Sequence, residues 1–198
     1  MTKEQVFEKA LTIQGWFPIE DMETAWDLVI NHVGKGDLVV EVGSWKGRSS
    51  YVFASACKEV GAKLICIDSF RGLIQPEHVK WELYHGKDGY YIEGNEGSIV
   101  HHIKENLKEF DNVEIWEGDS QQLHKKIKDG SAALIFIDGD HDMPVLGHDL
   151  DNYYKKVKIG GYFCGHDYET GNNVSEGVDP RFPKVNLYNT IWGVQRES

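Results

Sequence analysis

The sequence is poor in cysteine and has no long apolar run. Only three of its 198 residues are cysteines, and this odd, widely spaced set predicts neither a disulfide framework nor a cysteine-based zinc site. The densest apolar run, Ala132–Ile137, is far shorter than the roughly 20 residues that cross a bilayer. The first residues, MTKEQVFEKA, contain no secretory apolar segment. These absences favour a reducing compartment and predict a cytoplasmic protein.

Positive charge is also scarce. The chain has 21 Lys and Arg against 32 Asp and Glu, which gives a net charge of −11. Nucleic acids and anionic membranes bind clustered positive charge, so we expect neither as a partner and favour a small molecule. The apolar share of 40% and the charged share of 27% are typical of a globular protein. The length predicts a single domain over residues 1–198.

The order of predicted elements indicates an α/β protein. Residues 1–35 read as an N-terminal helical segment in which Asp21 caps a helix. Apolar runs then alternate with helices that begin near Gly47, Ser98, Ser120 and Pro144, and these runs predict strands at 38–42, 63–67, 113–116, 132–137 and 162–165. Such alternation predicts a mostly parallel sheet with helices on both faces.

Two further segments stand apart from this alternation. Residues 69–97 show no periodicity, and a stretch of that length predicts a lid or an acceptor-binding loop. Residues 169–187 read as a loop, and residues 190–196 as a last strand.

Each of the five strands ends near an acidic residue. These residues are Glu41, Asp68, Asp119, Asp138 and Asp167. The carboxyl ends of parallel strands meet at one edge of the sheet, which is where ligands bind in such folds. Because like charges repel, the edge predicts a cationic or hydroxyl-rich ligand.

The turn after the first strand favours S-adenosylmethionine over a phosphate-bearing cofactor. Gly43 and Gly47 are separated by three residues, and Trp45 stands where a dinucleotide fingerprint has its second glycine. No phosphate-binding loop of the G-x-x-x-x-G-K-[ST] kind is present in the sequence. Asp68 is suited to accept both ribose hydroxyls, and Asp119 with Ser120 to hold the adenine edge.

Five motifs in this order resemble the class I S-adenosylmethionine-dependent methyltransferases. They are EVGSWKGRS from Glu41, IDSF from Ile67, GDS from Gly118, IDGDH from Ile137 and GHDY from Gly165. The sequence is most similar to the small family with the IDGDH and GHDY signatures, related to macrolide-sugar and catechol-type O-methyltransferases. The resemblance implies a three-layer Rossmann-like methyltransferase fold with an antiparallel last strand, and a homodimer as one possible state.

The resemblance also assigns the cofactor site to residues of these motifs. The assigned residues are Glu41, Gly43, Ser44, Trp45, Gly47, Ser49, Asp68, Ser69, Phe70, Gly118, Asp119, Ser120, Asp138 and Gly139. Two departures from the family concern other segments. Pro180 and Pro183 stand where the family has another helix, and the stretch 69–97 is particular to this chain.

The ends of the fourth and fifth strands predict a divalent cation site. If these strands are neighbours, Asp138 and Asp167 lie about 5 Å apart, and two such carboxylates need a bridging cation. The related O-methyltransferases use a metal at the equivalent positions. We assign Asp138 and Asp167 as ligands, with His166 or Asp140 next, although several relatives have an acid at the position of His166. Mg²⁺ suits oxygen ligands, and an imidazole admits Mn²⁺.

The predicted function is metal-assisted O-methylation of a small polar molecule that carries a hydroxyl. Asp138 and His141 are the catalytic candidates, with His141 accepting the hydroxyl proton because imidazole titrates near neutral pH. Two alternatives stay open. One is a metal-dependent hydrolase that uses the Asp and His cluster, and the other is a non-catalytic binding module with the same fold.

Overall fold

A computed structural model describes residues 1–71 and 98–197. The predicted lid at 69–97 therefore lies outside the described residues, apart from 69–71. Within these described ranges, seven strands form one sheet in the order β3-β2-β1-β4-β5-β7-β6. Their bounds are β1 Leu38–Val42, β2 Lys63–Asp68, β3 Val113–Glu117, β4 Ala132–Ile137, β5 Val157–Gly165, β6 Asn186–Tyr188 and β7 Ile191–Gln195.

The first five strands are parallel, and β7 is antiparallel to both β5 and β6. The α/β prediction and the antiparallel last strand are thus confirmed. The order of the strands reverses between β1 and β4, and a crevice for ligands forms at such a switch point.

Alternating residues of the central strands enter two separate cores. On β2, Leu64 and Cys66 pack on one face of the sheet, whereas Ile65 and Ile67 pack on the other. This follows from the two-residue period of a strand. Because both faces are covered, the central strands are continuous apolar runs, as in parallel sheets generally.

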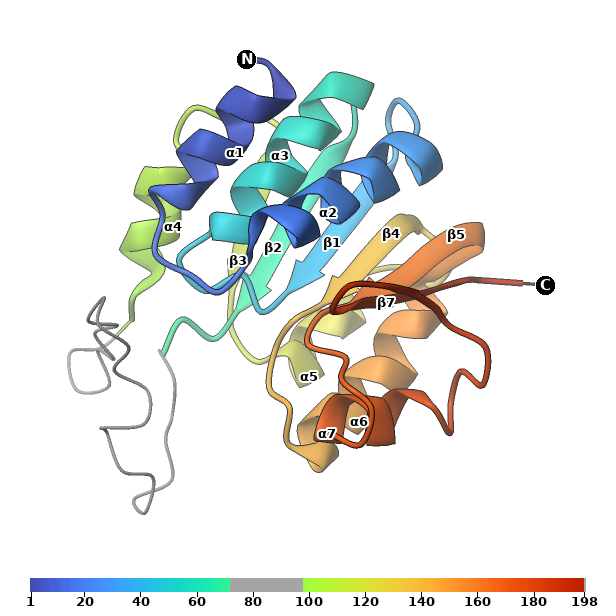
Figure 1. The fold of residues 1–198 in the computed structure, drawn as a ribbon. Coiled ribbons are helices and arrows are strands. Elements are labelled where there is room, and N and C mark those ends of the chain that lie inside the picture. Colours follow the sequence, from blue (N-terminus) through green and yellow to red (C-terminus); the bar gives the residue numbers. More distant parts are fainter. Residues whose placement is uncertain (72–97, 198) are drawn as a thin grey trace.

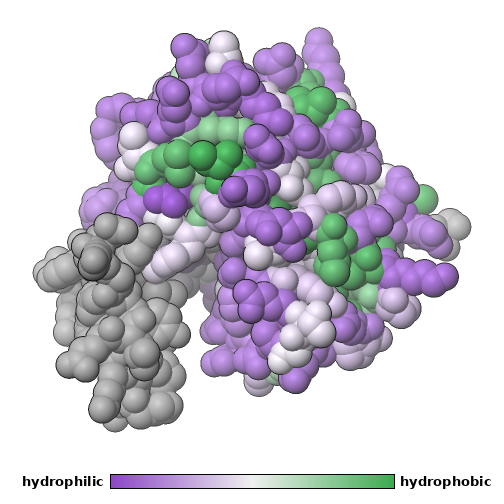
Figure 2. Space-filling model, in the orientation of Figure 1, coloured by the Kyte–Doolittle hydropathy of each residue, from purple (hydrophilic) through white to green (hydrophobic). Residues whose placement is uncertain are grey.

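Helices cover both faces of the sheet (Figure 1). On one face lie α1 Lys3–Leu11, α2 Ile19–His32, α3 Arg48–Val60 and α4 Val100–Asn106. On the other lie α5 Ser120–Leu123, α6 Met143–Tyr153 and α7 Asn173–Val178. Figure 2 shows that hydrophilic side chains dominate the visible surface and that the hydrophobic ones form small separate patches. Within the described ranges, no helix is long and apolar enough to cross a membrane.

The end of α6 and the start of β5 differ from the prediction. We expected a helix to about residue 158 and a strand from 162, but α6 ends at Tyr153 and β5 begins at Val157. Gly160 and Gly161 lie inside this strand, not before it. A Cβ on Gly161 would lie 2.7 Å from the carbonyl oxygen of Ala133. The diglycine therefore accommodates an irregularity in the pairing of β4 with β5.

The segment between β5 and β7 is not the loop that the sequence predicted. It contains α7, where the side chain of Asn172 accepts a hydrogen bond from the backbone N–H of Ser175 as an N-cap. A short helix is therefore present in this segment. The prolines follow the helix, which is a usual position for residues that cannot continue one.

The turn after β1 generates a test of the fold. Gly43 has φ +95°, and a Cβ there would lie 2.0 Å from the carbonyl oxygen of Asp138. Gly36 has φ +82° and open space around it. We expect Gly36→Ala to cost about 1–2 kcal/mol through the left-handed conformation alone. Gly43→Ala should cost more by about 1–3 kcal/mol, because it also overpacks the turn. Urea unfolding measures both variants, and equal losses would contradict this packing.

Candidate active site

The ends of the parallel strands lie together, held by backbone hydrogen bonds between neighbouring turns. The N–H of Gly118 donates to the carbonyl of Asp68, and the N–H of Asp138 donates to that of Val42, at 2.9 and 2.7 Å. On the other side of β4, the N–H of His166 donates to the carbonyl of Ile137 at 3.0 Å. The acidic residues after the strands therefore share one edge of the sheet, as the sequence predicted.

The glycine turn after β1 is fastened to the end of β2. Trp45 is in the left-handed region with φ 41°, and its N–H donates to Asp68 Oδ2 at 2.9 Å. The second oxygen of Asp68 accepts from the N–H of Phe70 at 2.6 Å. Burial raises the pKa of Asp68, against the effect of these two hydrogen bonds. A glycine is required at position 43 for a structural reason, because this turn packs directly on the backbone of Asp138.

Glu41 lies beneath this turn and not on its surface. Its side chain is fully buried, and its carboxylate accepts hydrogen bonds from the hydroxyls of Ser49 and Ser50. Burial raises the pKa of Glu41, although the hydrogen bonds from the two hydroxyls act to lower it. The two serines stand at the start of α3, so Glu41 ties that helix to the centre of the sheet.

The other predicted cofactor residues fall into exposed and buried sets. Ser69 and Asp119 are exposed, whereas the ring of Phe70 and the side chain of Ser44 are buried. The ring of Trp45 is half-buried and stacks on Trp16, with 4.7 Å between ring centroids. Gly47, Gly118 and Gly139 contribute backbone only.

Ser120 has a buried partner that sequence reasoning missed. Its hydroxyl donates to Asp149 Oδ2 at 2.9 Å, and its carbonyl accepts from the hydroxyl of Tyr153 at 3.1 Å. Asp149 is 2% exposed, and within residues 1–71 and 98–197 its Oδ1 accepts no hydrogen bond, although His148 Nδ1 lies 3.6 Å from it. Burial raises the pKa of Asp149 to about 6. Its position within an amphipathic helix had no signal in the sequence that distinguished it from a surface residue.

Three side chains at the ends of β4 and β5 could together hold a metal ion. One ligand atom from each of Asp138, His141 and Asp167 lies within 4.8 Å of the others. Asp167 has φ 57°, a strained conformation of the kind that clusters at functional sites. The two predicted carboxylate ligands are therefore brought together, and His141 joins them with Nε2 3.3 Å from Asp167 Oδ2.

Asp140 does not belong to this group of described residues. It is exposed, and its Oδ1 accepts a hydrogen bond from the N–H of Asp142 at 2.9 Å. Asp142 precedes α6, so the carboxylate of Asp140 stabilises the turn into that helix instead of facing Asp138. The prediction of Asp140 as a metal ligand receives no support from this geometry.

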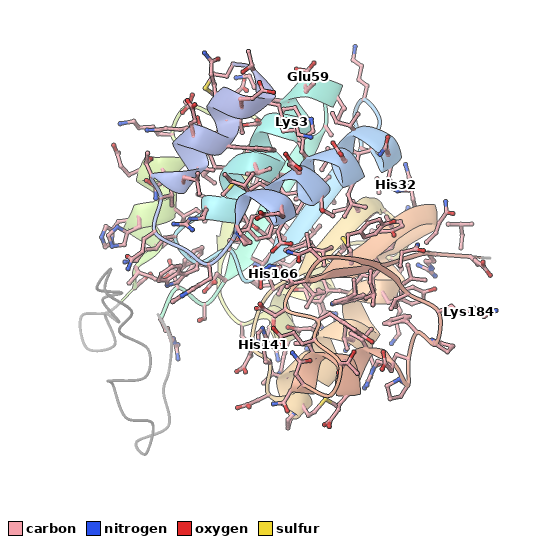
Figure 3. The ribbon with its side chains drawn as sticks, in the orientation of Figure 1. Lys3, His32, Glu59, His141, His166 and Lys184 are labelled. Atoms are coloured by element: carbon pink, nitrogen blue, oxygen red, sulfur yellow. The ribbon has the colours of Figure 1, made fainter. Side chains whose placement is uncertain are left out.

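His166 is buried behind the same cluster and is bound to Asp21. Its Nε2 lies 2.9 Å from Asp21 Oδ2, and its Nδ1 lies 3.4 Å from oxygens of both Asp138 and Asp167. The sequence predicted Asp21 as a helix cap, which is wrong: Asp21 lies within α2, after the N-cap Pro18, and is fully buried. Figure 3 shows His166 near the centre of the molecule and His141 further out.

The charges in this cluster shift one another's protonation. Burial by itself lowers the pKa of His166, but the surrounding carboxylates outweigh it and raise that pKa to about 12. Burial raises the pKa of Asp138, while the neighbouring His166 opposes this. At neutral pH the imidazolium of His166 is therefore one positive partner of these acids.

An open cavity of about 350 Å³ lies beside His166 and Asp167. The segment between α1 and α2 forms much of its wall, together with the start of α3. The remaining lining residues are Gly15, Trp16, Phe17, Pro18, Asp21, Arg48 and Thr190. The cavity gives a small molecule access to the cluster at the end of β5.

Comparison with known proteins places this chain and its fold in one class. A family described as a methyltransferase domain matches residues 40–168, more than half of the chain. The O-methyltransferase NovP is similar in structure, with a TM-score of 0.64 and 22% identity over 91% of this chain and 81% of that one. An S-adenosylmethionine-dependent O-methyltransferase from Thermotoga maritima has a TM-score of 0.62 and 13% identity over 98% and 71%.

A third similar structure belongs to a methyltransferase with a different kind of acceptor. It is a precorrin-6y C5,15-methyltransferase from Geobacter metallireducens, with a TM-score of 0.57 and 13% identity over 84% of this chain and 74% of that one. The fold is therefore shared by methyltransferases of several kinds. The chain belongs to the class I S-adenosylmethionine-dependent methyltransferases, and its sheet has the Rossmann-like topology of that class.

The buried acid beside Ser120 generates a test of this environment. Because the folded pKa of Asp149 is about 6 against 3.8 ordinarily, the folded state holds this proton more tightly, and stability falls as pH rises through that window. At pH 8 we expect Asp149→Asn to be more stable than the native chain by up to about 3 kcal/mol. The gain should vanish by about pH 4.

Urea unfolding across this pH range measures the difference. Asp111→Asn is the matched control, because the side chain of Asp111 is 91% exposed and its ion-pair partner is the exposed Lys58. A gain for Asp149→Asn that does not depend on pH would show that the carboxylate is not the cause.

Proposed function

We propose that this protein transfers a methyl group from S-adenosylmethionine to a hydroxyl oxygen of a small polar molecule, with the help of a divalent cation. The observation that carries the proposal is the group Asp138, His141 and Asp167 beside an open cavity. The comparisons support the cofactor and the class of reaction. The choice of oxygen as acceptor atom and the cation are our inference from the cluster.

The cofactor lies across the turn after β1. Asp68 accepts hydrogen bonds from the ribose hydroxyls, as acids at the end of the second strand do in nucleotide folds. Asp119 and Ser120 hold the adenine edge, and the acids around Gly43 attract the sulfonium and ammonium charges.

The donor set at the end of β4 and β5 fits a hard divalent cation. Asp138 and Asp167 supply carboxylate oxygens, which suit Mg²⁺, and an imidazole neighbour admits Mn²⁺. When bound, the cation supplies a Lewis acid that lowers the pKa of the acceptor hydroxyl. Asp138 and Asp167 would hold the cation beside the acceptor oxygen.

The residues of the chain position the reactants for an in-line displacement. The bond between the acceptor oxygen and the methyl carbon forms as the bond between that carbon and sulfur breaks, and S-adenosylhomocysteine leaves. His141 accepts the hydroxyl proton at its imidazole, and Asp167 orients that ring through the contact at 3.3 Å. Exposure of 43% lets His141 pass the proton to solvent.

The acceptor binds in the cavity between the N-terminal helices and the end of β5. Trp16 is 46% exposed there and offers a flat apolar surface to a ring. A catechol or a sugar diol matches such a surface and presents two adjacent oxygens to the cation. Incubation with catechols, sugar diols and S-adenosylmethionine, with mass spectrometry of the products, tests the proposal.

Methylated oxygen in a product that EDTA suppresses supports the proposal. Transfer to carbon or nitrogen would contradict the O-methylation, and undiminished transfer in EDTA would contradict the cation. The alternative of a binding module predicts cofactor binding without any product. No finding supports the alternative of a hydrolase, whose signature would be metal-dependent cleavage of esters without cofactor binding.

Removing the acid at the end of β2 should weaken cofactor binding. Asp68→Ala loses two hydrogen bonds to a charged acceptor, which together are worth at least about 3 kcal/mol, or about 100-fold in Kd. Calorimetry with S-adenosylmethionine measures the effect, and the exposed Asp111→Ala serves as control. Unchanged affinity in Asp68→Ala would reject the cofactor placement.

Removing one carboxylate ligand should separate cation binding from cofactor binding. Asp167→Asn keeps the left-handed conformation, which asparagine tolerates, but loses the negative charge. We expect the rise in melting temperature caused by Mg²⁺ or Mn²⁺ to disappear, while the rise caused by S-adenosylmethionine remains. A cation-induced shift of native size in this variant would place the cation elsewhere.

A further inference from the structure

The buried contact between α2 and the end of β5 points to a positioning residue. We propose that Asp21 orients His166 as the nitrogen ligand of the divalent cation, which leaves His141 to accept the proton. The inference rests on the proposed function, because it requires a cation between Asp138 and Asp167.

The ring of His166 is held in one orientation. A carboxylate can only accept a hydrogen bond, so Nε2, at 2.9 Å from Asp21 Oδ2, carries a proton and donates it. Phe17 and Phe136 flank the imidazole, with ring centroids 5.1 and 6.4 Å away. Nδ1 consequently faces away from Asp21 and toward the acidic pair.

The distances at Nδ1 match those between neighbouring ligands of one ion. Nδ1 lies 3.4 Å from Asp138 Oδ1 and 3.4 Å from Asp167 Oδ1. Adjacent ligands in an octahedral shell with bonds of about 2.1 Å lie about 3 Å apart. A cation bound by these atoms replaces the proton on Nδ1, which leaves to solvent.

The carboxylate of Asp21 is itself fixed by hydrogen bonds from three side chains. Besides His166, it accepts hydrogen bonds from Asn189 Nδ2 at 2.9 Å and from Thr190 Oγ1 at 2.8 Å. A carboxylate behind a ligating histidine fixes the ring and raises its basicity. The ring of His141 differs in both respects: its side chain is 43% exposed, and its Nε2 is paired with Asp167, itself a proposed ligand.

The proposal predicts which cation the site selects. Replacing an all-oxygen donor set by one with an imidazole moves the preference from Mg²⁺ toward Mn²⁺. The native chain should therefore bind Mn²⁺ more tightly than Mg²⁺. In the double variant Asp21→Asn with His166→Asp, which supplies a third carboxylate, the preference should move back toward Mg²⁺.

Calorimetric titration of the full chain with Mn²⁺ tests the role of Asp21. Loss of the supporting carboxylate in Asp21→Asn should weaken Mn²⁺ binding by about 10–100-fold. Asn189→Gly is the matched control, because it removes a donor from the other oxygen of Asp21. Asn189 has φ 55°, a conformation that suits glycine, so Mn²⁺ binding should be little changed in Asn189→Gly.

Electron spin-echo spectroscopy of bound Mn²⁺ then identifies the nitrogen ligand without depending on the folding of an Asp21 variant. The nitrogen modulation should disappear in His166→Asn and remain in His141→Asn. The reverse result, or equal Mn²⁺ affinity in Asp21→Asn and the native chain, would overturn the inference alone. A native chain that binds no Mn²⁺ or Mg²⁺ would instead overturn the cation in the proposed function.

Discussion

The gathering of acidic side chains at one edge of a parallel sheet is the constraint on which this site depends. Parallel strands end at the same edge, so an acid after each of several strands produces a local excess of negative charge. Some of that charge is neutralised within the fold, as when Asp21, Asp138 and Asp167 surround His166. The remainder creates a place for a cationic cofactor and a cation.

The acids at this edge serve different purposes because burial and partners differ. Glu41 is enclosed and bound by two serine hydroxyls, so it connects β1 to α3. Asp68 fastens the glycine turn through backbone N–H groups and remains half-buried. Asp167 lies beside the imidazoles of His141 and His166 and also lines the open cavity. Residue type alone does not distinguish these roles.

The fold could be predicted well because its signals are local. Apolar runs closed by Asp68 and Asp138 marked the strands, and the ordered motifs carried the resemblance to a family that the comparison confirms. The errors lie where local signals conflict: Gly160 and Gly161 read as a turn, yet they lie within β5 because its pairing with β4 is irregular. A short helix capped by Asn172 was missed because few residues carry its pattern.

The sequence by itself determined which side chains stand at the strand ends, because strand period and chain order place them there regardless of what packs around them. The tertiary structure decided which of them meet and which are enclosed. Asp21 and His166 are 145 residues apart, and their contact exists only because α2 packs across the end of the sheet. Likewise Asp140 turns toward α6 and away from the cluster, a choice that depends on backbone geometry and not on residue identity.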